Sequence, residues 1–413
     1  MQALPPSAPS DSRAGAWTAF NRGCYRLATG WRQRRVRPLP AVAGGDAPAG
    51  DAILYVAWGR IGDAVLGAQA LSLLRSRTRR RVVVVGRPET AAVLGPHADD
   101  FLALPAEDDT DATRAFVQAT AGPWFAAVTD LHAFHGGIPR LGAWLASLPA
   151  RHRLTYDGYA ARQLVAPLRT WPSAVDVVPP CAKGAGAAHR HVLHDTRHYL
   201  EVVLARLGHA GAVVLSEIAP CLPAPAGAAP SDVIACQPFS NNRKKDWPTS
   251  RWRDLFAEFP HERFLLLGGP RDRARAAELA AANVVDRCGT TDLPQAIAAI
   301  AAARAFVGVD SGLAHVAAAL RRPTLVVSHG SNLGYFFPYP SALGFDHVHV
   351  AADVRFSACA GCISACSREP LWRTYRLGAK CLREMPASEA TAALSRMLLL
   401  DANSEKPVEA TPV

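Results

Sequence analysis

The chain has 413 residues, of which 49% are hydrophobic and 19% are charged. This length is about two to three times that of a typical domain, and the composition lacks the high charge of disordered chains. No apolar stretch reaches the roughly 18–20 residues that a membrane-spanning helix needs. Nine cysteines, an odd number in so long a chain, favour a reducing compartment over a disulfide framework, so we expect a cytoplasmic protein.

Positive charge is concentrated at the N-terminus. Residues 1–50 carry seven arginines and two aspartates, which gives half of the chain's net charge of +10. Aromatic side chains are interleaved with the arginines, at Trp17, Phe20, Tyr25 and Trp31. Such a segment can lie on an anionic lipid surface or bind nucleic acid, or it can be a solvated basic arm. We predict a basic, flexible arm over residues 1–50, and its composition is not that of a secretory signal.

The folded part is predicted to begin after a flexible Pro/Gly/Ala-rich lead-in at residues 38–51. An apolar run stops at Gly59 and is followed by residues at helical spacing. Further runs without polar alternation are typical of parallel strands covered on both faces. The expected strands are residues 52–57, 82–85 and 126–129, with a helix at residues 63–75. A Rossmann-like N-terminal domain over residues 51–219 fits this order.

A second alternating series follows a proline-rich stretch, residues 220–230, which we predict to be the domain linker. The expected strands are residues 233–236, 264–267, 305–309 and 324–327, and the expected helices are residues 250–259, 271–282, 293–303 and 312–320. We therefore predict a second Rossmann-like domain over residues 231–402, followed by a disordered tail at residues 403–413. In such α/β folds ligands bind beyond the carboxyl ends of the strands, so we expect a central cleft faced by both domains.

The turn after the first strand holds the first candidate site. Gly59 and Gly62 allow close backbone approach, Arg60 lies between them, and Asp63 stands at the start of a helix. Asp63 can serve as a general base, or it can cap the helix by accepting its free amides. The turn lacks the glycine spacing of the dinucleotide fingerprint, which disfavours a nicotinamide enzyme.

Two further segments suggest the binding of an anionic ligand. Residues 308–315, GVDSGLAH, join an apolar strand to a helix, and the helix N-terminus with its free amides suits a diphosphate. Residues 240–248, SNNRKKDWP, place three consecutive cations beside a hydroxyl group and can stabilise a leaving group's charge. For the first segment the alternative is a plain N-cap by Asp310, and for the second it is a charged surface loop.

An ordered set of motifs resembles the lipopolysaccharide heptosyltransferase family, glycosyltransferase family 9, over about residues 52–400. These motifs are AWGRIGDAVLGAQAL at residues 57–71, KDWP at 245–248 followed by RWRDLF, LLLGGPRD at 265–272, and the long segment from CGTTD to AAAL at 288–320 with RPT after it. The resemblance implies an α/β GT-B fold and an inverting, metal-independent enzyme without a cofactor. It also implies transfer of a heptose from ADP-heptose to a lipopolysaccharide-core or related glycolipid acceptor, at the inner face of the inner membrane.

The resemblance also implies roles for individual residues. Asp63 would be the catalytic base on the acceptor hydroxyl, within an acceptor-side turn of Gly59, Arg60 and Gly62. Lys245 would act in catalysis and, with Ser240, contact the donor phosphates. Asp310 and the amides of Ser311, Gly312, Leu313 and His315 would hold the donor's sugar and diphosphate, and Asp272 would lie near the nucleoside.

Other patterns leave alternatives open. Cys359, Cys362, Cys366 and Cys381 have a spacing that suits zinc, but reduced packing thiols are the favoured explanation. Four histidines, His189, His191, His194 and His198, indicate the start of a helix in preference to a metal site. The D-x-D pattern at residues 109–111 is better explained as a helix cap than as a metal-binding motif.

Two alternative functions remain open at the level of sequence. One is a nucleotide-sugar glycosyltransferase with a different sugar or acceptor. The other belongs to a different class, a non-catalytic protein that docks on membrane or nucleic acid through its basic arm. Because residues 51–413 carry only +5 of net charge, nucleic acid is the less favoured partner.

Overall fold

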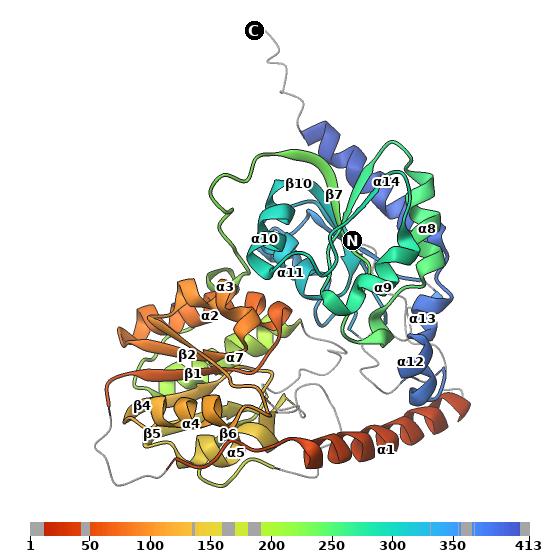
Figure 1. The fold of residues 1–413 in the computed structure, drawn as a ribbon. Helices are drawn as coiled ribbons and strands as arrows, with labels where there is room; N and C mark the ends of the chain where they lie inside the picture. The colour runs from red at the N-terminus through yellow and green to blue at the C-terminus, as the bar shows by residue number, and fades with distance from the viewer. Residues whose placement is uncertain are drawn as a thin grey trace, which may run out of the picture. The chain divides into compact units, whose positions relative to one another are not determined.

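The computed structural model describes residues 12–42, 50–133, 137–158, 170–180, 191–330, 332–353, 355–356, 366 and 368–404. The chain divides into an N-terminal unit, Thr18–Pro220, and a C-terminal unit whose body is Cys221–Cys362 and Cys366–Val413. Each unit contains a six-stranded sheet with helices packed against it (Figure 1). The two units are described separately below.

The N-terminal sheet has the strand order β3-β2-β1-β4-β5-β6, and every pair in it is parallel. Its strands are β1 (Ile53–Ala57), β2 (Val82–Gly86), β3 (Asp100–Ala103), β4 (Trp124–Thr129), β5 (Ala150–Tyr156) and β6 (Asp176–Val178). The helices are α2 (Ile61–Thr78), α3 (Ala91–Leu94), α4 (Thr110–Ala119), α5 (Gly137–Ser147) and α7 (Val192–Arg206), with 3₁₀ turns at Pro88–Thr90, Gly95–His97 and Leu215–Ile218. All five residues of β2 are buried, as expected for a strand covered on both faces.

The C-terminal sheet repeats this order around a different chain segment, as β12-β11-β10-β7-β8-β9, again all parallel. Its strands are β7 (Ser231–Gln237), β8 (Arg263–Leu266), β9 (Val284–Asp286), β10 (Ala303–Val309), β11 (Thr324–Val327) and β12 (Val348–Ala351). The helices are α8 (Thr249–Glu258), α9 (Arg273–Ala276), α10 (Leu293–Ala302), α11 (Gly312–Ala319), α12 (Leu371–Leu377), α13 (Lys380–Arg383) and α14 (Ala387–Ser404), with 3₁₀ turns at Arg243–Lys245, Pro270–Asp272, Ala277–Leu279 and Ser341–Leu343. The expected pair of Rossmann-like domains is confirmed by these two sheets.

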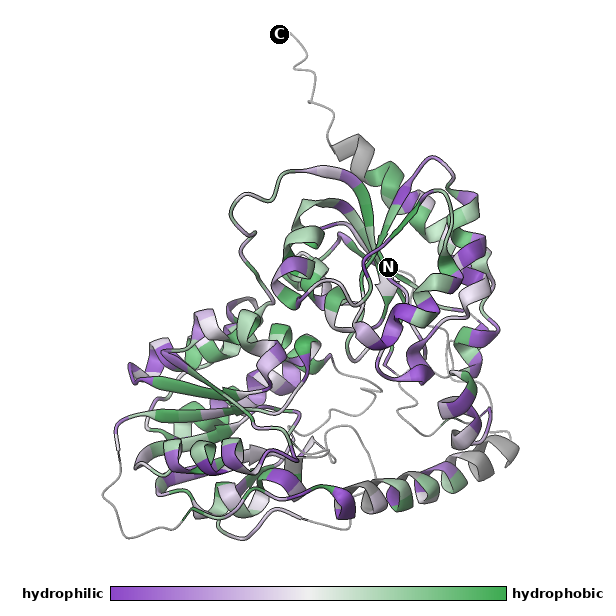
Figure 2. Cartoon of the chain, viewed as in Figure 1, coloured by the Kyte–Doolittle hydropathy of each residue, from purple (hydrophilic) through white to green (hydrophobic). Residues whose placement is uncertain are grey.

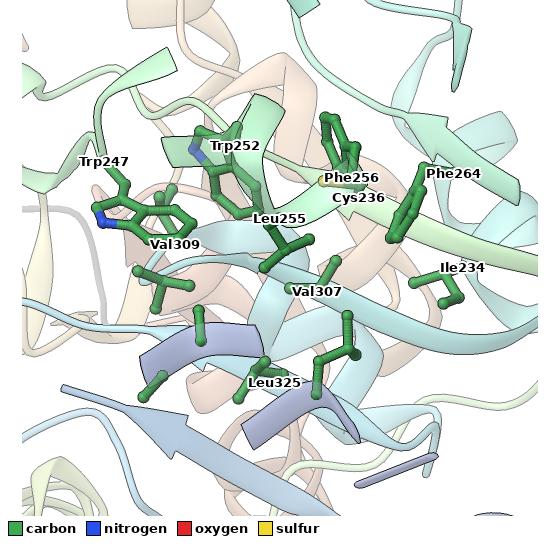
Figure 3. Packing of buried hydrophobic residues seen from close by; sticks show 14 of the residues in the cluster. Ile234, Cys236, Trp247, Trp252, Leu255, Phe256, Phe264, Val307, Val309 and Leu325 are labelled. Carbon is green, nitrogen blue, oxygen red and sulfur yellow. The ribbon is translucent and has the colours of Figure 1, made fainter. Parts of the chain in front are cut away.

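Large side chains fill the space between the C-terminal sheet and its helices (Figure 3). Trp252 and Phe256 of α8 are almost completely buried and lie near Phe264 of β8. Trp247 meets Trp252 edge-on, with ring centroids 5.1 Å apart, and its indole N–H donates to the carbonyl of Met385. The loop that follows β7 is therefore anchored to the core at one end, which limits where its cations can lie.

Both sheets reverse their winding direction beside their first strand. β1 lies between β2 and β4, and β7 lies between β8 and β10. At such a switch point the loops after two neighbouring strands diverge and leave a crevice at the carboxyl ends, which is where open α/β sheets bind ligands. Candidate ligand-binding residues therefore follow β1 and β4 in the N-terminal unit, and β7 and β10 in the C-terminal unit.

The N-terminal arm departs from the prediction of a flexible segment. Ser12–Arg35 forms the helix α1, and the chain after it is held against the N-terminal unit. Leu39 and Val42 are buried, and their amides donate to the carbonyl of Arg140 and the hydroxyl of Ser147 on α5. The lead-in therefore has partners within its first five residues, at Leu39 and Val42, because these two large apolar side chains reach the core beneath α5.

A second departure concerns residues 271–282, where one long helix was expected. The structure has a helical segment over residues 270–279 that is α-helical only at Arg273–Ala276 and 3₁₀ on both sides. Only Ala276 and Leu279 of this segment are buried, so few apolar contacts favour a longer regular helix. Strands β3, β5, β6, β9 and β12 were not anticipated either, and those at the sheet edges are short and partly exposed.

Hydropathy is distributed as the sheets require, with apolar strands and polar outer helix faces (Figure 2). Within the part of the chain that is described, none of the helices has the length and apolar character needed to cross a bilayer. The proline-rich residues 220–230 form neither helix nor strand.

Candidate functional site

Asp63 lies at the switch point of the N-terminal unit, in the first turn of α2. Its Oδ2 accepts a hydrogen bond of 2.9 Å from the amide of Arg60, the residue that precedes the helix. This is the capping role that the sequence left open. The carboxylate is nevertheless 22% exposed and its other oxygen, Oδ1, lies 3.3 Å from Nε2 of His132. Asp63 therefore caps α2 and keeps a surface toward solvent, and the two roles are compatible.

Asp130 and His132 follow β4, the neighbouring strand, and complete this group of side chains. Asp130 accepts from the amide of Gly59 at 2.6 Å with Oδ2 and from the amide of His132 at 3.0 Å with Oδ1. Burial raises the pKa of Asp130 to about 6, with Asp63 adding to the rise, while His132 and the two amides act in the opposite direction. Sequence reasoning missed both residues, although an acidic residue directly after an apolar strand beside β1 was a usable signal.

The turn itself is shaped by Gly59. A side chain at this position would place a Cβ 2.4 Å from Cβ of Asp63 and 3.0 Å from Oδ2 of Asp130. Glycine is thus required for close approach of the turn to both carboxylates. Arg60 is exposed beside it, and Gly62 lies within the first turn of α2.

A second arginine, also missed, joins the turn from the loop after β2. Arg87 donates from Nε to the carbonyl of Trp58, and its guanidinium lies 4.7 Å from the centroid of the Trp58 ring. Burial lowers the pKa of Arg87, Arg60 lowers it further, and Glu89, Asp130 and Asp63 oppose them. The two arginines place positive charge around the Asp63 carboxylate.

Asp310 lies at the switch point of the C-terminal unit, directly after β10. Its side chain is 2% exposed, and Nζ of Lys245 lies 3.2 Å from Oδ1 and 2.9 Å from the backbone carbonyl of the same residue. Nδ2 of Asn332 donates to Oδ2 at 3.0 Å. Burial alone would raise the pKa of Asp310, but Lys245 and nearby His329 and His315 outweigh it and lower the pKa to about 2. The buried carboxylate is therefore ionised throughout the neutral range.

The three cations of the loop after β7 have different environments. Lys245 pairs with Asp310 and is 19% exposed, so its ammonium remains within reach of a ligand. Lys244 is buried, 6.0 Å from the centroid of the Tyr375 ring, and Arg243 is exposed. The hypothesis of a merely solvated charged loop therefore fits only Arg243.

Ser240 and Ser311 border the same region. The hydroxyl of Ser240 accepts from the amide of Asn242, and its own amide donates to Asp246, so this serine also stabilises the loop. The hydroxyl of Ser311 donates to Oε1 of Gln237 and does not cap α11, which begins at Gly312. The first amides of α11 thus have no side-chain cap, and the positive end of the helix dipole lies there.

Leu313 and His315 are placed differently from Ser311 and Gly312. Both side chains are buried, and Nδ1 of His315 lies 2.7 Å from the hydroxyl of Tyr339. Counted from the N-cap residue Ser311, the amide of His315 is the first in α11 that can donate to a carbonyl of the helix itself. His315 thus supports the site through its ring, which stacks on Phe337 with centroids 4.3 Å apart.

Aromatic side chains from the segment after β11 lie close to this pair of charges. Phe336 is 5.7 Å from Nζ of Lys245 and meets His315 edge-on. His329 is fully buried near Asp310, and burial lowers its pKa to about 3, so its ring is neutral. No sequence pattern predicted these residues at the site, because they come from a loop without regular spacing.

Asp272 has a local structural role. Its Oδ2 accepts from the amide of Gly269 at 2.9 Å at the start of a 3₁₀ turn, and Oδ1 lies 3.9 Å from Arg275. A side chain at Gly268 would place a Cβ 2.9 Å from Oδ2 of Asp272, so the loop after β8 also needs a glycine. Asp272 lies in the loop beyond the carboxyl end of β8, and the resemblance places a nucleoside contact at this residue.

The weaker motifs have mixed outcomes. Asp109 accepts from the amide of Ala112 and caps α4, as expected for the D-x-D segment. His191 caps the start of α7, whereas His189 lies outside the described residues. Cys359 and Cys362 also lie outside them, and Cys381 accepts from the amide of Gly330 through its sulfur.

Known proteins that are similar to this chain indicate which kind of protein carries these two sites. The family model of glycosyltransferase family 9 (heptosyltransferase) matches residues 143–343. Lipopolysaccharide heptosyltransferase 1 of Pseudomonas aeruginosa is 37% identical over 135 residues, which cover 30% of this chain and 35% of that protein. Over these residues the chain is similar to glycosyltransferase family 9. The matched region spans only about a third of this curated relative's length.

Solved structures of family 9 proteins share the fold. ADP-heptose lipopolysaccharide heptosyltransferase II of Escherichia coli is 17% identical with a TM-score of 0.56, covering 85% of this chain and 99% of its own. An E. coli heptosyltransferase solved with ADP-2-deoxy-2-fluoro heptose is 17% identical with a TM-score of 0.52, covering 84% and 99%. Two parallel sheets of Rossmann order and these likenesses establish the GT-B fold of this chain.

We expect Gly59→Ala to destabilise the N-terminal unit by about 1–3 kcal/mol, because the added methyl group overpacks the turn against Asp63 and Asp130. The measurement is urea-induced unfolding. The matched control is Gly95→Ala, since a Cβ at Gly95 meets no atom within 4 Å. Equal stability of the two variants would contradict the close packing of this turn.

Proposed function

We propose that this chain is an inverting, metal-independent glycosyltransferase that moves a heptose from ADP-heptose to a lipopolysaccharide-core acceptor. The observation that carries the proposal is the pair of partly exposed Lys245 and buried Asp310 at the uncapped N-terminus of α11. Heptosyltransferases are among the family relatives, and a structure in the same fold is of an enzyme with an ADP-heptose analogue. The proposal therefore joins a charge arrangement of this chain with the chemistry named for its relatives.

The proposed donor site must neutralise the negative charge that grows on a departing nucleoside diphosphate. Lys245 supplies a cation that Asp310 holds in place, and its partial exposure leaves an N–H for a phosphate oxygen. The free amides at the start of α11 supply further donors, with Ser311 and Gly312 at the surface of the site. Ser240 and Asp272 complete the proposed donor side, near the phosphates and the nucleoside.

The proposed acceptor chemistry is general base catalysis by Asp63. The carboxylate removes the proton from the acceptor hydroxyl while its oxygen attacks the anomeric carbon, and the bond from that carbon to the diphosphate breaks. Direct displacement of this kind inverts the anomeric configuration. Arg60 and Arg87 surround Asp63 with positive charge, which favours an anionic acceptor such as a phosphorylated glycolipid.

Donor binding gives the first test. We expect ADP to raise the melting temperature of the purified protein with EDTA present, because a ligand of the folded state stabilises it by mass action. Lys245→Ala should weaken ADP binding about tenfold or more, since it removes the exposed cation. Arg243→Ala is the matched control and should leave ADP affinity unchanged. Loss of the ADP response in EDTA alone would contradict metal independence.

The acceptor reaction gives the second test. Asp63→Asn keeps the size of the side chain and an oxygen for the Arg60 amide, but it removes the base. We expect transfer from ADP-heptose to fall by about 10²–10⁴-fold, the usual contribution of a general base, while ADP affinity stays within about twofold. The measurement is product formation with anomeric assignment by NMR. A fall in ADP affinity equal to the fall in rate would assign Asp63 to capping alone.

Contact with the anionic inner face of the membrane is part of the same proposal. Helix α1 has six arginines and no acidic residue. Leu27 and Trp31 are 72% and 56% exposed, and the Arg35 guanidinium lies 3.7 Å from the centroid of the Trp31 ring. Cations beside exposed large apolar side chains suit the headgroup region of an anionic bilayer, where a glycolipid acceptor would be found.

Vesicle binding tests this surface. We expect the full-length protein to sediment with vesicles that contain anionic phosphatidylglycerol but not with neutral phosphatidylcholine vesicles. Arg34→Glu with Arg35→Glu should weaken binding by at least tenfold, because each arginine near the surface contributes about 1 kcal/mol. Charge reversal at exposed Arg253 and Arg287 is the matched control. Equal binding by both double variants would exclude α1 as the docking surface.

A further inference from the structure

We propose that His132 is a positioning residue for Asp63: its ring lies against one carboxylate oxygen and fixes the direction in which the carboxylate meets the acceptor hydroxyl. This inference rests on the proposed function, because it gives Asp63 the role of base. Its geometric basis is the distance of 3.3 Å between Nε2 of His132 and Oδ1 of Asp63. The contact joins two elements that follow neighbouring strands, β1 and β4.

The His132 backbone is fixed independently of Asp63. Its amide donates to Oδ1 of Asp130 at 3.0 Å, and the other oxygen of Asp130 accepts from Gly59. One carboxylate thus ties the loop after β4 to the turn after β1. The side chain of His132 is only 11% exposed, so its ring has little freedom to turn away from Asp63.

The Asp63 carboxylate is in turn held at two points. Oδ2 accepts from the Arg60 amide, and Oδ1 faces His132. A carboxylate restrained in this way presents a fixed lone-pair direction to an incoming hydroxyl, and fixed orientation is a large part of catalytic power. Without His132 one of these two restraints is lost, so the carboxylate can rotate further and the base is misplaced.

The kinetic test compares three variants with ADP-heptose and a lipopolysaccharide-core acceptor. His132→Ala should lower kcat about 10- to 100-fold with the KM for ADP-heptose unchanged, as expected for a group that acts through the base. His132→Gln should restore most of kcat, because its amide N–H can donate to Asp63. His97→Gln is the matched control, since His97 bonds to Ser72 on the same helix α2.

Retention of the wild-type kcat by both His132 variants would overturn the inference, even if transfer itself is confirmed. ADP binding and the melting temperature of each variant show whether the protein is folded. A wild type that binds ADP but transfers no heptose would instead count against the proposed function.

Discussion

Parallel strand pairing is the constraint on which both sites depend. A parallel sheet delivers the carboxyl ends of all its strands to one edge, so residues far apart in sequence meet there without any long-range motif. Asp63 and Asp130 are brought together because β1 pairs with β4, and Lys245 and Asp310 because β7 pairs with β10. The same strand order in both units therefore places a carboxylate beside a cationic or imidazole partner twice in one chain.

The two carboxylates differ because their surroundings differ. At Asp310 the nearby cations outweigh burial, so the anion is stable and can fix the Lys245 ammonium. At Asp130 burial outweighs the donors, so the group changes its protonation close to neutral pH. A permanent charge suits a site that holds a diphosphate, whereas a variable one suits a site through which a proton passes.

The regular elements were predictable because their signals are local. The run of valines that makes β2 and the strand-to-helix transitions at Asp63 and Asp310 can be read from consecutive residues. Asn332, Phe336 and His132 could not be found in this way, because each comes from a loop and becomes relevant only through strand pairing. The arm was predicted to be flexible for a related reason. Its composition shows no regular apolar face, so no sequence pattern indicated that Leu39 and Val42 are buried beneath α5.

That short stretch after α1 has a consequence for how the protein can be shortened. Arg140, itself buried, donates to the carbonyls of Arg37 and Pro105, and so joins the stretch to α5 and to the loop after β3. Removal of residues 1–50 as a dispensable leader would strip Leu39 and Val42 from the core and leave the Arg140 guanidinium with fewer acceptors. A cut before Arg37 spares these contacts, because they are made by Arg37, Leu39 and Val42 and so lie beyond the end of α1.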